Sequence, residues 1–269
     1  MSGKSGDASR RAALAGLDWL AAAGADEVIG DQPVDRRRRD AAPAVPPASS
    51  PPPESPPSSG PPLAPSQGVE DGRRAAAAAG DLDSLKAALE SFEGCALKHT
   101  ATNLVFADGD PASGVMVIGE APGADEDREG LPFVGVSGRL LDRMMSFIGR
   151  DRTGFYVTNI VFWRPPGNRN PSDAEIAACM PFVHRHIALV RPRAILLLGR
   201  PASNNLLRRN DAISRMRGNW FDMQVDGMDQ PVAALPTFHP AYLLRNPAQK
   251  REAWLDLLTL KARLAEDGQ

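Results

Sequence analysis

Short apolar segments alternate with longer amphipathic segments through the C-terminal part of the chain. The short segments have the length and composition of buried strands, and the longer ones repeat apolar residues at helical spacing. Because strands and helices alternate, the sequence predicts an α/β fold, a three-layer α/β/α sandwich with a central, mostly parallel four-stranded sheet. Strands are predicted at 115–118, 155–162, 194–198 and 232–238, and helices at 137–148, 172–190, 201–208 and 247–264.

The pattern changes in the N-terminal quarter of the chain. Between positions 33 and 65 there are 12 prolines mixed with serine, alanine and a run of arginines. Such a segment buries too little apolar surface to offset its chain entropy, so residues 31–68 are expected to form a disordered linker. Residues 1–30 are predicted to hold a short helical segment that docks on the main domain or on a partner protein. Residues 69–269 are expected to form one folded domain with a single core.

Composition and charge narrow the class of protein without indicating one function. The 269 residues carry 31 lysines and arginines and 33 aspartates and glutamates, and they show neither an apolar run of bilayer length nor a signal peptide. We therefore expect a cytoplasmic protein with no membrane partner. Residues 150–269 carry 17 basic and 11 acidic side chains, whereas residues 69–149 carry 7 and 14. This asymmetry is a modest indication of an anionic partner, although two oppositely charged halves also attract each other.

Polar loops follow the predicted strands, at the edge of the sheet where α/β proteins bind their ligands. The first loop, GEAPG at 119–123, leads through a row of carboxylates to Phe133. A glycine-rich loop can cradle phosphate, but these carboxylates would repel one, and neither a Walker motif nor a full dinucleotide fingerprint is present. The alternative is a solvated acidic turn, which leaves Phe133 unexplained because the loop has no evident core to fill.

The loops after the second and fourth predicted strands carry the other candidate residues. The sequence YVTN ends at Asn159 and is followed by RPPGNR at 164–169. An asparagine at a strand end can simply form a turn, or its amide can read a pyrimidine edge with one acceptor and two donors. In FHPAYLLR at 238–245, His239 is either structural or catalytic, and the proline after it stiffens the turn. The apolar residues and Arg245 suit a wedge that enters DNA beside a phosphate.

The three loops together resemble the motifs of one enzyme family. The segments GEAPGADEDREGLPFVG, YVTN with RPPGNR, and FHPAYLLR closely resemble those of the bacterial and archaeal family 4 uracil-DNA glycosylases, and the similarity covers about residues 92–264. The resemblance implies a monofunctional DNA repair enzyme that flips uracil out of DNA and hydrolyses its N-glycosidic bond. The implied partner is uracil-containing DNA, and the reaction itself requires no cofactor.

The resemblance also implies a role for each site residue. Glu120 would position or activate water and favour the cationic sugar, and His239 would donate to uracil O2 as negative charge develops there. Asn159 would pair with the N3/O4 edge of uracil, and Phe133 would stack on the flipped base. Glu126 would stand beside uracil C5, so that the methyl group of thymine clashes.

Further positions complete the implied site. Gly119 and Ala121 would line the uracil pocket, and the alanine stands where family 1 enzymes have a water-activating aspartate, which leaves Glu120 as the candidate base. If the basic residues contact phosphates, DNA binding should weaken steeply with salt. The implied DNA contacts are Arg164, Arg169, Arg217, Tyr242, Leu243, Leu244 and Arg245.

One departure from the family concerns its iron–sulfur cluster. Typical members hold a four-iron cluster with four cysteines, whereas the corresponding positions here read Phe92, Cys95, Trp163 and Cys179. Two thiolates cannot complete a site that needs four ligands, and two cysteines are also too few for a disulfide scaffold. We therefore expect free thiols, aromatic rings in the vacated space, and no cluster, metal or other cofactor.

Two other functions stay open from the sequence. One is a non-catalytic DNA-binding or damage-sensing module of the same fold. The other is a glycosylase for another deaminated base, hypoxanthine or xanthine, or one that is trapped on its product, although no added basic loop with a second histidine precedes His239. We expect a monomer, because the enzyme must reach a flipped base. The proline-rich arm would tether a repair or replication protein or space the first helix from the domain.

Overall fold

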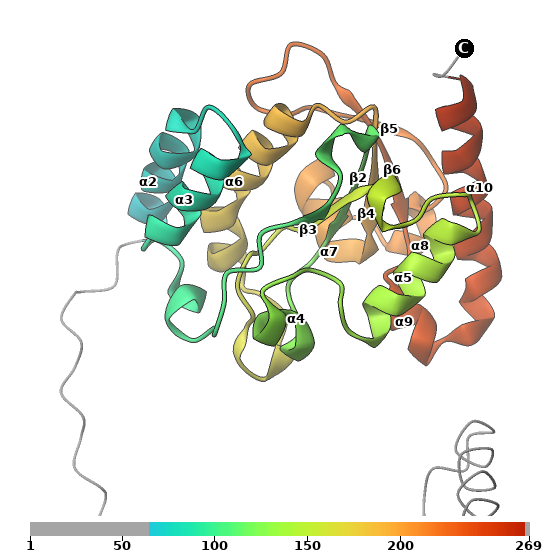
Figure 1. The fold of residues 1–269 in the computed structure, drawn as a ribbon, viewed down its shortest axis with the longest axis horizontal. Helices are drawn as coiled ribbons and strands as arrows, with labels where there is room; N and C mark the ends of the chain where they lie inside the picture. The colour runs from blue at the N-terminus through green and yellow to red at the C-terminus, as the bar shows by residue number, and fades with distance from the viewer. Residues whose placement is uncertain (1–64, 267–269) are drawn as a thin grey trace, which may run out of the picture. The chain divides into compact units, whose positions relative to one another are not determined.

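The computed structural model describes residues 65–266 (Figure 1). The predicted helical segment at 1–30 and most of the predicted linker lie outside the described residues. Within the described range, no helix has both the length and the apolar character needed to cross a membrane.

A six-stranded mixed sheet forms the centre of the fold, two strands more than predicted. Its order is β1-β3-β2-β4-β6-β5, and the four central strands are parallel, as the alternation of strands and helices predicts. The edge strands β1 and β5 run antiparallel to their neighbours. They were missed because two or three residues are too few to show a periodic pattern. The strands are β1 (Asp108–Gly109), β2 (Val115–Gly119), β3 (Tyr156–Asn159), β4 (Ala194–Leu198), β5 (Phe221–Met223) and β6 (Val232–Thr237).

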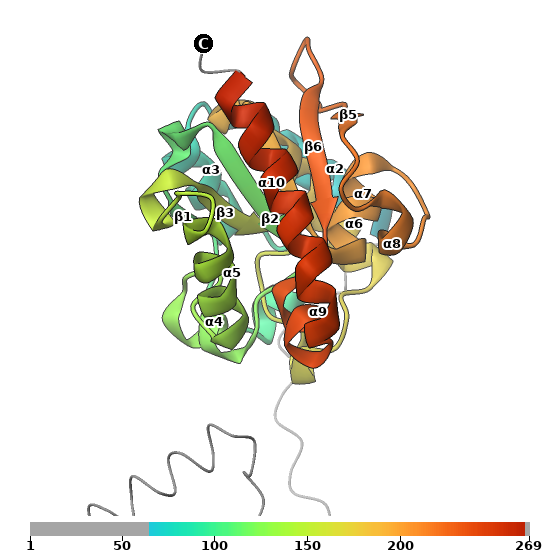
Figure 2. The same cartoon turned by 90° about the vertical axis from the view of Figure 1, so that its right-hand side faces the viewer.

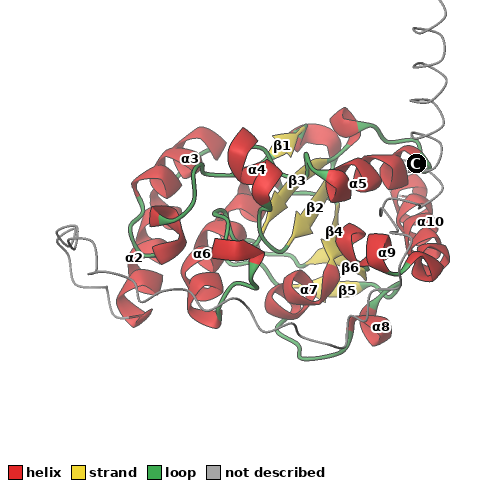
Figure 3. Cartoon of the chain, turned by 90° about the horizontal axis from the view of Figure 1, so that it is seen from below, coloured by secondary structure: helices red, strands yellow, loops and turns green. Residues whose placement is uncertain are grey.

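Helices cover both faces of this sheet, which confirms the three-layer architecture (Figures 1 and 2). Alternate residues of β2 enter opposite cores: Met116 and Ile118 pack with α2, α3, α6 and α7, whereas Val115 and Val117 pack with α5, α9 and α10. Figure 3 shows the sheet between the two helical layers. The helices are α2 (Pro65–Ala78), α3 (Leu82–Ser91), α4 (Ala124–Glu129), α5 (Val136–Ser146), α6 (Asp173–Val190), α7 (Gly199–Leu207), α8 (Ile213–Met216), α9 (Pro240–Arg245) and α10 (Lys250–Glu266).

Helix α2 begins inside the segment predicted as linker, because a proline is tolerated in the first turn of a helix. Its alanines then permit close packing on α6: Ala76 and the following Ala79 are almost fully buried. A capping box between Asp81 and Ser84 starts α3. The predicted N-terminus of α6 is confirmed, with Ser172 as the N-cap and a capping box to Glu175.

The segment after β3 brings two loops of the site together. The predicted strand at 155–162 ends at Asn159, but the chain continues along the first loop. The main-chain N–H of Ile160 donates to the carbonyl of Gly119 at 2.9 Å, and that of Val161 donates to the carbonyl of Glu120 at 3.1 Å. The loop that carries Glu120 is therefore held by the backbone of the segment that follows β3.

Candidate active site

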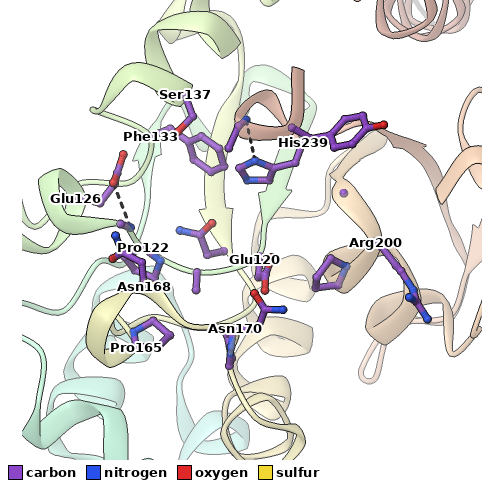
Figure 4. Close-up of a pocket in the computed structure, with 18 of the residues that line it drawn as sticks. Glu120, Pro122, Glu126, Phe133, Ser137, Pro165, Asn168, Asn170, Arg200 and His239 are labelled. Atoms are coloured by element: carbon purple, nitrogen blue, oxygen red, sulfur yellow. Dashed lines mark hydrogen bonds between the residues drawn. The ribbon is translucent and has the colours of Figure 1, made fainter. Parts of the chain in front are cut away.

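A pocket of about 620 Å³ opens at the carboxyl ends of the four parallel strands, as expected for this fold. Its walls come from the loops after β2, β3, β4 and β6 (Figure 4). Besides Arg169, Tyr242 and Arg245, which are three of the residues predicted to contact DNA, the pocket brings together six of the seven residues predicted for catalysis or uracil binding. These are Glu120, Ala121, Glu126, Phe133, Asn159 and His239.

Gly119 lets two of these side chains approach each other at the floor of the pocket. A β-carbon at this position would lie 2.5 Å from both Asn159 Oδ1 and Phe133 Cζ, so no larger residue fits. Asn159 is almost fully buried, at 2% exposure, and its Oδ1 has no hydrogen-bond partner among the described residues. Leaving a buried acceptor unpaired costs about 1–3 kcal/mol, so this oxygen is a candidate contact for a ligand donor.

Phe133 has a buried ring and an unusual backbone. It is 5% exposed, and its ring lies 5.8 Å from that of His239 between centroids. Its φ of 57° is in the left-handed region, which costs a residue with a side chain about 1–3 kcal/mol. The sequence showed no core around this loop, yet the ring packs into the core that α5 shares with the sheet.

Glu126 fastens the acidic loop to the start of α5. Its Oε1 accepts hydrogen bonds from the main-chain N–H groups of Val134 and Gly135 at 3.0 and 2.9 Å, and its Oε2 accepts one from Gly123 at 3.1 Å. The acidic stretch is therefore neither a phosphate cradle nor a freely solvated turn. The buried carboxylate of Glu126 holds one wall of the pocket in place.

Glu120 stands at the pocket with an uncommitted carboxylate. Burial raises the pKa of its carboxyl, and no charged or hydrogen-bonding neighbour among the described residues contributes to that shift. A carboxylate with a raised pKa and no competing partner is suited to take a proton from water.

His239 is held as a neutral ring with a defined tautomer. Its Nδ1 accepts a hydrogen bond from the main-chain N–H of Ala241 at 3.1 Å, so the proton of the neutral ring is on Nε2 (Figure 4). Burial, helped by the positive charge of Arg245, lowers the pKa of His239 to about 4. The ring is therefore an uncharged donor at neutral pH.

The segment after His239 is a helix rather than a loop. Proline is favoured at the first helical position, and the His239 side chain caps α9. As a result Tyr242, Leu244 and Arg245 are exposed, and the Tyr242 ring stacks on Phe238 with centroids 5.1 Å apart. Leu243 is only 1% exposed and packs in the core, so the helical turn removes it from the set of side chains that can reach DNA.

The predicted DNA-contacting arginines differ in their surroundings. Arg164 donates to Asn168 Oδ1 at 2.7 Å, and Arg169, which lines the pocket, makes a two-point ion pair with Glu175. Arg217 instead pairs with the carboxylates of Asp256 and Glu252 on α10, and its side chain is 16% exposed. Its guanidinium therefore fixes α10 and is not available to a phosphate.

The pocket also contains residues that the sequence reading missed. Ser137, Asn168, Asn170 and Arg200 line it, as Figure 4 shows. Arg200 closely follows β4, so the same strand-end rule that selected the other loops would have selected it. Nothing in the sequence pattern indicated Ser137 as a site residue, because Ser137 reaches the pocket only through the fold of the loop before α5.

The four positions that correspond to cluster ligands lie in the core between the sheet, α3 and α6. We call Phe92, Cys95, Trp163 and Cys179 the thiol–aromatic cluster; all four are buried. Cys179 Sγ donates to Cys95 Sγ at 4.0 Å, and this contact together with burial raises the pKa of the Cys179 thiol.

The Phe92 ring of this cluster is packed tightly against its neighbours. The Phe92 ring lies 4.9 Å from that of Phe182, and a β-carbon at Gly94 would come within 2.4 Å of Phe92 Cζ. Over residues 65–266 no group of three or more histidine, cysteine, aspartate or glutamate side chains could hold a metal ion. The residues present do not fit a four-thiolate iron–sulfur cluster.

Comparison with known proteins agrees with this fold and pocket. The family model described as "Uracil DNA glycosylase superfamily" matches residues 106–258, more than half of the chain. The chain therefore belongs to the uracil-DNA glycosylase superfamily.

Named relatives narrow the family further. The "Type-4 uracil-DNA glycosylase" of Pyrobaculum aerophilum is 36% identical over 181 residues, which are 66% of this chain and 91% of the relative. The protein of the same name from Archaeoglobus fulgidus is 36% identical over 175 residues, 64% of this chain and 87% of the relative. That from Thermotoga maritima is 38% identical over 153 residues, 56% and 77% of the two chains. Within the superfamily, the chain is thus a member of the type-4 family, which confirms the resemblance of the three loops.

Proposed function

We propose that this chain is a DNA repair glycosylase that flips uracil out of DNA and hydrolyses its N-glycosidic bond, leaving an abasic site. The observation that carries the proposal is the buried Oδ1 of Asn159, which has no hydrogen-bond partner among the described residues and shares its pocket with the Phe133 ring and the neutral His239. The relatives named type-4 uracil-DNA glycosylase support the same activity.

Asn159 selects the base. Uracil presents an N3–H donor beside an O4 acceptor, which match an amide oxygen and an amide N–H. Cytosine presents the reverse arrangement, so its binding would leave the buried Oδ1 unpaired and bring two acceptors together. Phe133 supplies the flat surface on which the base stacks.

Glu126 excludes thymine by standing beside C5 of the bound base. Its carboxylate is fixed by three main-chain N–H groups, so it cannot move aside for a methyl group without breaking hydrogen bonds. Selection against thymine thus comes from a rigid wall and selection against cytosine from hydrogen bonding.

Bond cleavage separates a cationic sugar from an anionic base. The C1′–N1 bond breaks with its electron pair leaving on uracil, and His239 Nε2–H donates to O2 where the negative charge collects. Water attacks C1′, a C–O bond forms, and Glu120 accepts the proton that the water loses. These steps use only protein side chains and water, and we propose that the enzyme works without a cofactor.

Helix α9 and the flanking arginines hold the DNA. Tyr242 and Leu244 are exposed on α9 and fill the space left by the extruded nucleotide, while Arg245, Arg164 and Arg169 contact phosphates. We further propose that the enzyme acts as a monomer and that the proline-rich N-terminal arm recruits another repair or replication protein.

The test uses labelled oligonucleotides with one uracil opposite G, opposite A or in a single strand, treated with alkali to break abasic sites. We expect scission by the wild type and a rate roughly 10²- to 10³-fold lower in Asn159→Ala. Asn204→Ala is the matched control, because Asn204 Oδ1 is also buried and unpaired among the described residues but does not line the pocket. Salt-sensitive DNA binding without scission by the wild type would contradict the proposal and indicate a damage-sensing module.

A further inference from the structure

We propose that Arg152 is a positioning residue for the Phe133 ring on which uracil stacks. It acts through the backbone of residues 132–133, which we call the stacking platform together with the Phe133 ring. This inference rests on the proposed function for its reaction but on separate contacts for its geometry. Arg152 opens the short 3-10 helix η3 (Arg152–Gly154) just before β3, and it does not line the pocket. Its position therefore gives it no contact with the base.

The guanidinium of Arg152 joins three parts of the chain. Its Nη2 donates to the carbonyl of Pro132 at 2.6 Å and to that of Phe133 at 3.3 Å. Its Nη1 donates to Asp142 on α5 at 3.0 Å, and its Nε donates to Asp108 on β1 at 2.8 Å. The planar fork of arginine matches such divergent acceptors, and the two carboxylates fix its orientation.

The platform needs this support because its backbone is in an unfavourable conformation. The left-handed φ of Phe133 is accompanied by a close approach of its carbonyl to the first turn of α5, where a β-carbon at Gly138 would lie 1.8 Å from that oxygen. Gly138 leaves the oxygen in place, and Arg152 supplies a donor to it. Without the guanidinium, the loop is free to relax to an ordinary φ, which moves the ring.

The platform loop is thus held from two sides. Glu126 binds the N–H groups that follow Phe133, and Arg152 binds the carbonyls of Pro132 and Phe133. The Phe133 side chain lies in turn against Gly119. Two oppositely charged residues from different elements therefore set the ring that stacks on the base.

The first test compares Arg152→Met with Arg150→Met. Arg150 is a matched control in the same segment: it is partly buried and donates to a backbone carbonyl, that of Gly154 at 2.6 Å, which is not part of the platform. We expect faster amide hydrogen exchange over residues 130–135 in Arg152→Met alone, and a single-turnover rate about 10- to 100-fold lower, since small misplacements of reacting groups have effects of this size. Arg152→Lys should recover part of the exchange protection and part of the single-turnover rate, because a lysine can still donate to a carbonyl.

A double-mutant cycle separates positioning from general stability. If Arg152 acts through the ring, Arg152→Met lowers the rate in the wild type but has little further effect in a Phe133→Ala background. Equal effects in both backgrounds would overturn the inference, as would unchanged exchange in residues 130–135. A folded wild type that releases no uracil would refute the proposed function; the exchange experiment would still decide the role of Arg152 in holding the platform.

Discussion

The pocket at the strand ends and the thiol–aromatic cluster lie at different places in one fold and follow opposite rules. In the pocket, polar groups are left uncommitted: Asn159 Oδ1 has no partner among the described residues, and burial raises the pKa of the Glu120 carboxyl. In the cluster, the rings of Phe92 and Trp163 are packed into the core and the two thiols contact each other. The pocket retains binding capacity at a cost in stability, and the cluster contributes stability without an open binding site.

This contrast separates residues that matter for the reaction from residues that matter for folding. Polar groups in the pocket are stabilised only when a ligand arrives, so their substitution should change rates more than the free energy of unfolding. Aromatic side chains in the cluster already make their packing contacts in the protein without ligand. Their substitution should therefore change the free energy of unfolding more than the reaction rate.

The largest effect is expected at Glu120. Glu120→Gln removes the proton acceptor but keeps the size of the side chain, and the rate should fall about 10²- to 10⁴-fold, the usual contribution of a general base. Asp125→Asn is the charge-matched control, because the Asp125 carboxylate on α4 is partly exposed, ion-paired with Arg128 and absent from the pocket lining. Equal rates for Glu120→Gln and the wild type would remove Glu120 from the mechanism.

The pH dependence of the wild type follows from the same residue. Protonation abolishes the base, so the rate should fall as the pH drops through the raised pKa of Glu120. His239 has a pKa of about 4, so its ring is still neutral at the pH values where the rate begins to fall. Protonation of His239 should therefore not contribute to the onset of the fall. A single-turnover pH profile should therefore lose this acidic limb in Glu120→Gln. A limb that persists unchanged in the variant would assign it to another group.

The next effect is on stability and tests the cluster. Phe92→Ala should lower the free energy of unfolding by about 3–5 kcal/mol, because it leaves a cavity beside Phe182. Phe147→Ala is the matched control, since Phe147 is 61% exposed and loses mainly its edge-to-face contact with Trp254, so the free energy of unfolding should fall by only about 0.5–1.5 kcal/mol. Urea unfolding measures the free energy of unfolding of both variants. Uracil release by folded Phe92→Ala at low temperature should equal that of the wild type; a large loss of rate would connect the cluster to the pocket.

Both regions were only partly predictable from the sequence. The central strands have strong apolar patterns, so the edge that holds the site followed from their order, and the three loops then supplied Glu120, Asn159 and His239. What the sequence did not show depends on contacts between distant residues. The helical turn that buries Leu243, the ion pairs that engage Arg217, and the Arg152 hydrogen bonds to the platform all arise only after the elements pack.

The smallest effect is expected from removing the thiols. Cys95→Ala and Cys179→Ala each delete one buried sulfur, which resembles the loss of one methyl group and should lower the free energy of unfolding by about 1 kcal/mol. If the two cysteines instead held part of an iron–sulfur cluster, their removal would abolish a visible absorption band and bound iron, and would destabilise the domain far more. Anaerobic purification, iron analysis and urea unfolding of the double variant distinguish these outcomes. Iron in the wild type that disappears with the thiols would show that the rings of Phe92 and Trp163 do not replace the cluster, and the contrast between the two regions would then fail.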